Sequence, residues 1–139
     1  MDHLASADAV TVLIVDDDEE TRDALDDAVR ALGYATVTAC DGVAAWDEHT
    51  RARVDVILSD WRMPRMDGLT LCRRVRTDLS VRPYAHFIFV TGDADRAHFL
   101  DAMRAGADAF VAKPVDLEEL EARLDVVRRL ILFHRHSTP

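Results

Sequence analysis

The stretch Val12-Leu13-Ile14-Val15-Asp16-Asp17 decides the fold, because four consecutive apolar residues end abruptly in two carboxylates. A strand that is buried on both faces of a parallel sheet has such a short, continuous apolar run. The pattern recurs in Val56-Ile57-Leu58-Ser59-Asp60, Phe87-Ile88-Phe89-Val90-Thr91 and Phe110-Val111-Ala112-Lys113. Ligands of such sheets bind just beyond the carboxyl ends of the strands. The sequence therefore predicts a parallel sheet whose carboxyl edge gathers three acids, one hydroxyl and one ammonium group.

Helical patterns lie between these runs, so that strands and helices alternate along the chain. Strands are expected at about residues 11–15, 34–39, 54–59, 86–90 and 108–112. Helices are expected before Gly33, at about residues 43–52, 67–78 and 94–104, and from Asp116 onward. Five alternations with short connections predict a single α/β domain, with helices on both faces of the sheet.

Apolar residues recur at helical spacing in three of the expected helices and should face the sheet. They are Leu25, Ala28, Val29 and Leu32; Leu69, Cys72, Val75 and Leu79; and Leu117, Leu120, Leu124, Val127 and Ile131. A second apolar set appears only near the end of the last helix, at Val126, Leu130 and Phe133. Three interpretations of this second set are open: a frayed amphipathic end, a self-association surface, or a signalling helix that continues into a further domain.

The composition is that of a globular protein with an excess of acids. The 139 residues, 49% apolar and 31% charged, fit one domain. A formal net charge of −9 argues against a direct nucleic-acid surface, which needs a basic footprint. Two cysteines without metal-ligand spacing, and an N-terminus without a long apolar stretch, favour a cytoplasmic protein with neither a disulfide nor a membrane segment.

Three carboxylates, those of Asp16, Asp17 and Asp60, are expected to converge, because their strands should be neighbours in the sheet. Each pair repels by roughly 4 kcal/mol at 4 Å and an effective dielectric constant of about 20, so that a cation is expected to bridge them. Mg²⁺ suits the site because it accepts carboxylates, keeps several waters and pairs with phosphate oxygens. Thr91 and Lys113 would then meet the oxygens of a phosphoryl group. An aspartate can itself be the nucleophile and form an acyl phosphate.

Four segments of the chain resemble the receiver domain of two-component response regulators. They are residues 12–18, 59–68, 89–92 and 105–114, and the resemblance extends from about Val10 to Arg129. The pattern Asp-x-x-Met-Pro-x-Met-Asp-Gly, which begins at Asp60, is the most specific of the four. The resemblance implies a flavodoxin-like, doubly wound sheet of five parallel strands in the order 2-1-3-4-5, with five helices.

The resemblance also implies the roles of the acids. Asp60 would be the phosphoacceptor. Asp17, Asp60 and the backbone carbonyl of Arg62 would ligate Mg²⁺, or Mn²⁺ in its place, while Asp16 would act mainly through water. Arg62 and Asp93 flank the mouth of the site at positions that the motif does not determine, and Trp61 and Gly92 also flank the site. Two interpretations stay open: Arg62 pairs with Asp93 over the entrance, or Arg62 touches the phosphoryl group.

The switch residues follow from the same resemblance. Thr91 and Lys113 would bind the phosphoryl group, and the bond from Lys113 to Pro114 is typically cis in the family. Phe110 occupies the aromatic switch position, although its spacing fits a core phenylalanine equally well. The signal would reach a face formed by the fourth helix, the fifth strand and the fifth helix. That face is expected to carry His98, Phe99, Arg123 and Arg128.

The resulting prediction is a signalling switch rather than an enzyme. A sensor histidine kinase or a histidine phosphotransfer protein would phosphorylate it, and an output partner or a second copy would bind the activated face. We expect an N-terminal tail at residues 1–9, a receiver domain at 10–130 and a C-terminal extension at 131–139. The chain would be a stand-alone regulator or a piece of a larger one.

Three other functions compete with the switch. A phosphohydrolase of the haloacid dehalogenase type also uses an aspartate, a lysine and Mg²⁺, and Asp16-x-Asp18 imitates its first motif. Such an enzyme needs a further acidic pair on a later strand, and no strand-like run follows Lys113. A receiver-like adaptor would signal without phosphorylation, but all the site residues that phosphorylation requires are present. A flavin-binding protein would need a Ser/Thr/Gly-rich phosphate loop after the first strand.

Overall fold

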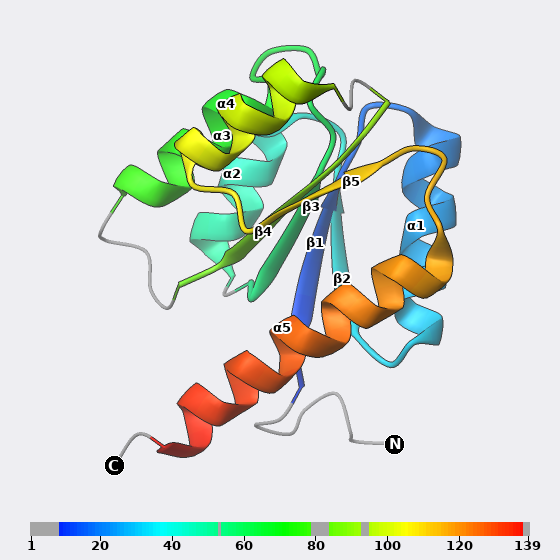
Figure 1. Ribbon diagram of the computed structural model, residues 1–139, viewed down its shortest axis with the longest axis vertical. Helices are drawn as coiled ribbons and strands as arrows, with labels where there is room; N and C mark the ends of the chain where they lie inside the picture. Colours follow the sequence, from blue (N-terminus) through cyan, green and yellow to red (C-terminus); the bar gives the residue numbers. More distant parts are fainter. Residues whose placement is uncertain (1–8, 53, 79–83, 93–94, 138–139) are drawn as a thin grey trace.

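A parallel sheet of five strands forms the centre of the computed structural model, which describes residues 9–52, 54–78, 84–92 and 95–137 (Figure 1). The strands are β1 (Thr11–Val15), β2 (Ala35–Ala39), β3 (Val56–Ser59), β4 (His86–Thr91) and β5 (Ala109–Ala112). Their spatial order is β2-β1-β3-β4-β5, and every neighbouring pair is parallel. This confirms the predicted topology. The expected tail at residues 1–8, Leu79 and Asp93 lie outside the described residues.

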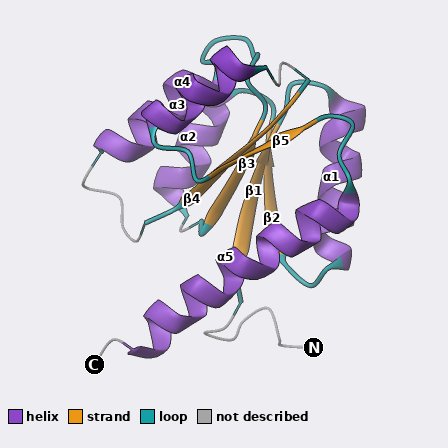
Figure 2. Cartoon of the chain, viewed as in Figure 1, coloured by secondary structure: helices purple, strands orange, loops and turns teal. Residues whose placement is uncertain are grey.

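Five helices cover the two faces of the sheet (Figure 2). They are α1 (Glu19–Ala31), α2 (Gly42–Arg51), α3 (Gly68–Thr77), α4 (Arg96–Ala105) and α5 (Leu117–Ser137). Helices α1 and α5 lie on one face, and α2, α3 and α4 lie on the other. Among the described residues, no helix combines the length and apolar composition needed to cross a bilayer.

Each face of the sheet has its own apolar core. Alternate strand residues such as Leu13, Ile57 and Phe89 pack against α2, α3 and α4. Their neighbours in sequence, such as Ile14, Leu58 and Ile88, pack against α1 and α5. Because successive side chains of a strand point to opposite faces, strands that are covered on both sides must be apolar throughout. The continuous runs in the sequence have this origin.

Three helix positions differ from the apolar pattern. Leu32 and Leu117 were expected to face the sheet, but 37% and 57% of their surfaces are exposed. Leu32 is the C-cap of α1, and Leu117 is the first residue of α5, so both lie at helix ends rather than in the packed turns. Leu71 is fully buried although it was not expected to be. Helix α3 packs against both α2 and α4, so more of its circumference is covered.

His49 on α2 gives the fold a predicted dependence on pH. Its side chain is buried, and no described residue bonds its Nδ1 atom. Burial lowers the pKa of His49 below the ordinary value of 6.5. The unfolded chain therefore binds a proton more readily, and the free energy of unfolding should fall as the pH is lowered through this range.

Urea denaturation at about pH 5.5 and about pH 7.5 tests this dependence. The loss of stability at the lower pH should be smaller in His49→Met than in the wild type. His86, whose pKa burial also lowers, is retained in both proteins, so the difference isolates His49. An equal loss in the two proteins would contradict the prediction.

Candidate functional site

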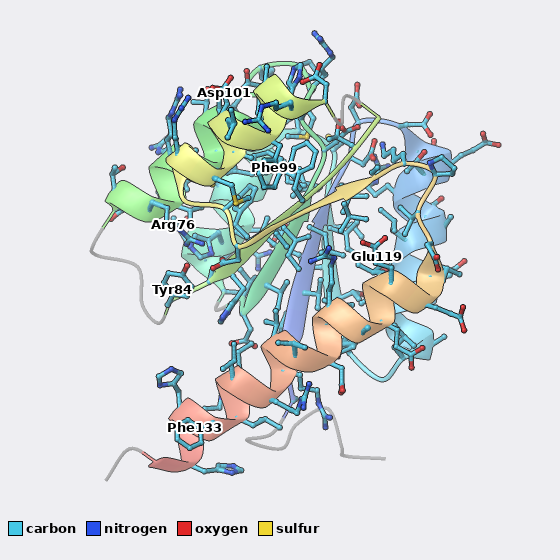
Figure 3. All side chains as sticks on the ribbon, in the orientation of Figure 1. Arg76, Tyr84, Phe99, Asp101, Glu119 and Phe133 are labelled. Atoms are coloured by element: carbon cyan, nitrogen blue, oxygen red, sulfur yellow. The ribbon has the colours of Figure 1, made fainter. Side chains whose placement is uncertain are left out.

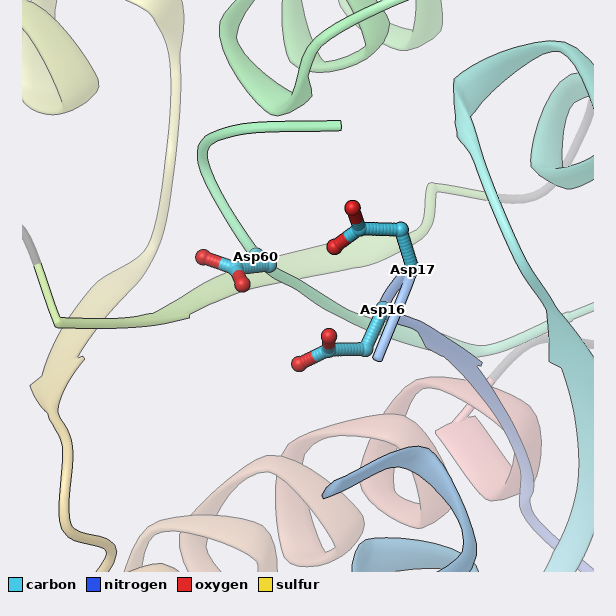
Figure 4. Close-up of side chains that lie close together, drawn as sticks. All are labelled: Asp16, Asp17 and Asp60. Carbon is cyan, nitrogen blue, oxygen red and sulfur yellow. The ribbon is translucent and has the colours of Figure 1, made fainter. Parts of the chain in front are cut away.

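Three carboxylates converge at the carboxyl ends of β1 and β3 (Figure 4). Asp16 and Asp17 follow β1, and Asp60 follows β3. The two strands are paired, and the backbone N–H of Asp60 donates to the carbonyl of Val15 at 3.0 Å. One oxygen from each of the three carboxylates lies within 4.8 Å of the other two. The convergence expected from the sequence is therefore present in the structure.

The three acids differ in their exposure. Asp16 is buried, Asp60 is half-buried and Asp17 is exposed. Asp16 is held in place because its Oδ1 accepts from the N–H of Asp18 at 2.9 Å, while its carbonyl accepts from Arg22 at the same distance. Burial raises the pKa of Asp16, although hydrogen bonds from Lys113 and Asp18 oppose this effect. Asp16 is thus the fixed inner member of the cluster, and Asp17 and Asp60 are nearer to solvent.

Lys113 bridges two of these acids. Its ammonium group donates to Oδ2 of Asp16 and to Oδ2 of Asp60, each at 2.9 Å. Burial alone would lower the pKa of Lys113, but these two hydrogen bonds and the two negative charges raise it above the ordinary 10.5. The bond from Lys113 to Pro114 is cis. Three carboxylates against one ammonium leave two negative charges, which one divalent cation would neutralise.

Thr91 lies on β4, next to β3, and Phe110 lies on β5, the edge strand that pairs with β4. Thr91 ends β4 and is buried, and its carbonyl accepts from the N–H of Lys113 at 2.9 Å. Phe110 is partly buried, and its ring centroid lies 6.2 Å from that of Phe89 and 5.9 Å from that of Phe99. Gly92 follows Thr91 and is exposed. All five predicted strand-end residues, Asp16, Asp17, Asp60, Thr91 and Lys113, thus lie at this edge of the sheet, and the ring of Phe110 is next to that of Phe99 on α4.

Trp61 is in contact with the site on one side and with α4 on the other. Its N–H donates to Oδ1 of Asp60 at 2.6 Å, and its ring is buried against Phe89 and Phe110. The imidazole of His98 meets the indole edge-on, with 4.7 Å between the ring centroids. His98 was expected on the exposed face, but this contact leaves it half-buried. Arg128 was also expected there, but it lines a hollow with Tyr34 and Glu121 beside α1.

The mouth of the site is a shallow hollow of about 410 Å³. Asp17, Trp61, Arg62, Met63 and Asp67 line it. Arg62 is exposed, which fits a position at the entrance. Asp93, the partner of Arg62 in one of the two open interpretations, lies outside the described residues.

Sequence reasoning missed a second ion pair close to the site. Nε of Arg65, in the loop after β3, donates to Oδ2 of Asp41 at 2.8 Å. Asp41 is buried and caps α2 by accepting from the N–H of Ala44 at 2.8 Å. The hydrogen bond from Arg65 lowers the pKa of Asp41. The dipeptide Asp41-Gly42 before an apolar helix is a recognisable cap signal, but nothing in the sequence indicates that Arg65 reaches it.

Comparisons with known proteins place this geometry in a family. The family model described as the response regulator receiver domain matches residues 12–125. A probable chemotaxis protein CheY from Rhizobium etli is 34% identical over 125 residues, which cover 89% of this chain and 96% of that protein. A probable transcriptional regulator ycf27 from Guillardia theta is 37% identical over 118 residues, which cover 85% of this chain and 45% of the relative. The response regulator MprA of Mycobacterium bovis is 37% identical over 121 residues, 87% of this chain and 51% of that protein.

The chain therefore spans about half the length of several of the curated relatives that it matches.

Solved structures of similar proteins have the same fold as this chain. The chemotaxis protein CheY4 of Vibrio cholerae superposes with a TM-score of 0.79 at 30% identity, covering 86% of this chain and 98% of that one. A putative response regulator from Chloroflexus aurantiacus superposes with a TM-score of 0.81, also at 30% identity, covering 87% and 98% of the two chains.

Proposed function

Because the chain belongs to the family of response regulator receiver domains, we propose that it is a signalling switch that accepts a phosphoryl group on Asp60. The observation that carries the proposal is the arrangement around this side chain. Asp60 lies at the centre of the site, with one oxygen bonded to the Trp61 N–H and the other to the Lys113 ammonium. Two hydrogen-bond donors thus orient the Asp60 carboxylate, which is still accessible to a molecule that carries a phosphoryl group.

Asp60 is the acceptor in this proposal because its two rivals are less well placed. Asp16 is 1% exposed and is bonded to Lys113 and to the N–H of Asp18, so a donor molecule cannot reach it. Asp17 is exposed, and the Lys113 ammonium bonds Asp16 and Asp60 rather than Asp17. An oxygen of Asp60 would attack the phosphorus atom, and the bond to the leaving group, such as the imidazole of a phosphohistidine, would break as that group takes the electron pair.

The donor set fits a hard divalent cation. Asp16, Asp17 and Asp60 offer converging carboxylate oxygens, which Mg²⁺ and Mn²⁺ prefer, and the backbone carbonyl of Arg62 would add a further oxygen ligand. When bound, the cation would neutralise charge on the transferring phosphoryl group. Lys113 would contribute a second positive charge from the opposite side of Asp60. The residues of this chain would therefore contribute by positioning the Asp60 carboxylate and by neutralising charge, with little further chemical work.

We further propose that phosphorylation is transmitted through Thr91, Lys113 and Phe110. A phosphoryl group on Asp60 would offer new acceptor oxygens to the Lys113 ammonium and to the Thr91 hydroxyl. Phe110 lies between Trp61 and Phe99, so any shift of β4 and β5 would reach α4 through these rings. A sensor histidine kinase or a phosphotransfer protein of the cytoplasm would supply the phosphoryl group.

The test of this function is a phosphorylation assay on the purified chain. Incubation with acetyl phosphate and Mg²⁺ should add one phosphoryl group, measured by intact mass, and removal of the metal with EDTA should prevent the addition. An unmodified protein in the presence of both reagents would contradict the proposal.

The output surface is the face of α4, β5 and α5, which exposes large apolar side chains (Figure 3). Phe99 on α4 is 44% exposed, and Phe133 on α5 is 67% exposed. Val126 and Leu130 extend the stripe along α5, so the second apolar set predicted from the sequence is exposed rather than part of the core. Such a stripe is typical of a surface that binds another protein or a second copy.

Activation is therefore expected to promote self-association through α5. In sedimentation velocity at tens of micromolar, beryllofluoride with Mg²⁺ should strengthen dimerisation by about 5- to 150-fold. Phe133→Glu and Leu130→Glu should abolish the effect, whereas Leu117→Glu, an exposed apolar position in the first turn of the same helix, should not. If the wild type stays monomeric with beryllofluoride, the dimer is contradicted, and the output partner must be a different protein.

A further inference from the structure

The loop that follows the acceptor strand is fastened to the start of α2 at two points. Arg65 donates to the carboxylate of Asp41 at 2.8 Å, an ion pair between residues that lie 24 positions apart. One residue further along each segment, the N–H of Gly42 donates to the carbonyl of Met66 at 3.1 Å. The two contacts tie the loop to a helix that carries none of the site residues.

The backbone conformation of Arg65 indicates that these contacts between the loop and α2 have a function. Arg65 has a φ of 68°, in the left-handed region, which is unfavourable for a residue with a Cβ atom. Glycine or asparagine would adopt the same backbone more easily. Residues held in such a conformation persist only where the surroundings over-determine them, and they cluster at functional sites. Here the surroundings supply a buried carboxylate that accepts from the arginine.

The close approach of Gly42 leaves the loop little freedom to shift. A Cβ atom at Gly42 would lie 2.3 Å from the carbonyl oxygen of Met66 and 2.7 Å from the Met66 side chain. The start of α2 therefore touches the loop backbone directly. At its other end the loop is closed by the N–H of Gly68, which donates to the carbonyl of Trp61 at 2.8 Å. Both ends of the segment that contains Arg62 and Met63 are thus fixed.

We propose that Asp41 and Arg65 form a brace that positions this loop, and with it the Arg62 carbonyl, for binding the divalent cation. Neither side chain contacts the three acids in the described structure, so both are positioning residues. The inference rests on the proposed function, because it assigns the brace to the metal site of the switch. It predicts that loss of the ion pair weakens metal binding although every metal ligand is still present.

Metal affinity of single and double variants tests the brace. Trp61 next to Asp60 reports Mg²⁺ by its fluorescence, and a Trp46→Phe background removes the second tryptophan, which lies on α2. Asp41→Asn keeps the helix cap, since asparagine caps as well as aspartate, but removes the charge. Arg65→Ala removes the other partner. Each variant should bind Mg²⁺ about tenfold more weakly than the background protein, and the double variant should be no weaker than the single ones.

Two further variants separate the ion pair from backbone strain and from general charge. Arg65→Gly relieves the left-handed strain but lacks the side chain, so it should be more stable than Arg65→Ala and bind Mg²⁺ equally weakly. Arg30→Ala, which breaks an exposed pair with Asp26 and Asp27 on α1, should leave metal affinity unchanged. The brace would be overturned if Asp41→Asn and Arg65→Ala both bound Mg²⁺ with wild-type affinity. It would also be overturned if the double variant lost affinity by the sum of the two single effects.

A measurement without metal distinguishes failure of the brace from failure of the proposed function. In metal-free protein, hydrogen exchange of the Gly42 amide should accelerate in Arg65→Ala and Asp41→Asn, because this amide bonds the loop that the brace holds. If the wild type binds no Mg²⁺, the proposed function is wrong, and the exchange rates still decide whether the brace orders the loop. Unchanged exchange in both variants would overturn the brace even where metal binds.

Discussion

Asp60→Asn is expected to abolish phosphorylation by acetyl phosphate, with a loss of at least about a hundredfold in initial rate. The amide cannot act as the nucleophile that the carboxylate provides, while its size and its contacts with the Trp61 N–H are retained. The substitution also removes one of the two carboxylates that the Lys113 ammonium bridges. Intact mass at several times after mixing with donor and Mg²⁺ gives the rate directly.

Asp67→Asn is the matched control for this experiment. Asp67 lines the same mouth, but it caps α3 by accepting from the N–H of Thr70 at 2.8 Å, and asparagine caps equally well. Its phosphorylation should stay within about threefold of the wild type. Labelling of Asp60→Asn at the wild-type rate would show that another side chain, such as Asp16 or Asp17, accepts the phosphoryl group.

Gly68→Ala should lower the free energy of unfolding by about 2–4 kcal/mol. A Cβ atom at Gly68 would lie 2.1 Å from the carbonyl oxygen of Asp60 and 2.9 Å from the Phe89 ring. In an open helix the same change would be favourable, because alanine has the higher helix propensity. The clash with the backbone of Asp60 must therefore displace α3 or Asp60, and the proposed phosphorylation should slow as well.

Gly92→Ala provides the comparison, since Gly92 also adjoins the site. Among the described residues, and apart from its chain neighbours, no heavy atom lies within 4 Å of the position that its Cβ would occupy. Urea denaturation should place Gly92→Ala within about 0.5 kcal/mol of the wild type, while Gly68→Ala unfolds at a clearly lower concentration. Equal midpoints for the two variants would mean that α3 accommodates the methyl group without cost.

The sheet and the gathering of acids were predictable because they follow from local patterns and one topological rule. Each apolar run had the length of a buried strand, and parallel strands bring their carboxyl ends to a common edge. Asp16, Asp60, Thr91 and Lys113 meet for that reason alone. The order of the strands came from the family resemblance, since the apolar pattern does not say which strands are neighbours.

Contacts that depend on side-chain direction or on a rare backbone angle were not predictable. Nothing in the segment around Arg65 indicates a positive φ, and its partner Asp41 is on another element. His98 looked like a solvent-exposed helix residue, yet Trp61 covers its ring. Leu71 departs from the expected stripe because α3 packs between two other helices, a fact of tertiary arrangement rather than of periodicity.

The bridge that Lys113 makes has a practical consequence for chemical labelling. Lys113 is the single lysine among the 139 residues, and 16 of the 17 basic residues are arginines. Amine-reactive dyes, crosslinkers and biosensor coupling reagents will therefore react only with the chain's amino terminus and the ammonium group of Lys113. Coupling at Lys113 would remove its hydrogen bonds to Asp16 and Asp60, so attachment through the exposed thiol of Cys40 is preferable. Conversely, isotopic reductive methylation would place one lysine label between Asp16 and Asp60, beside a second label at the chain's amino terminus.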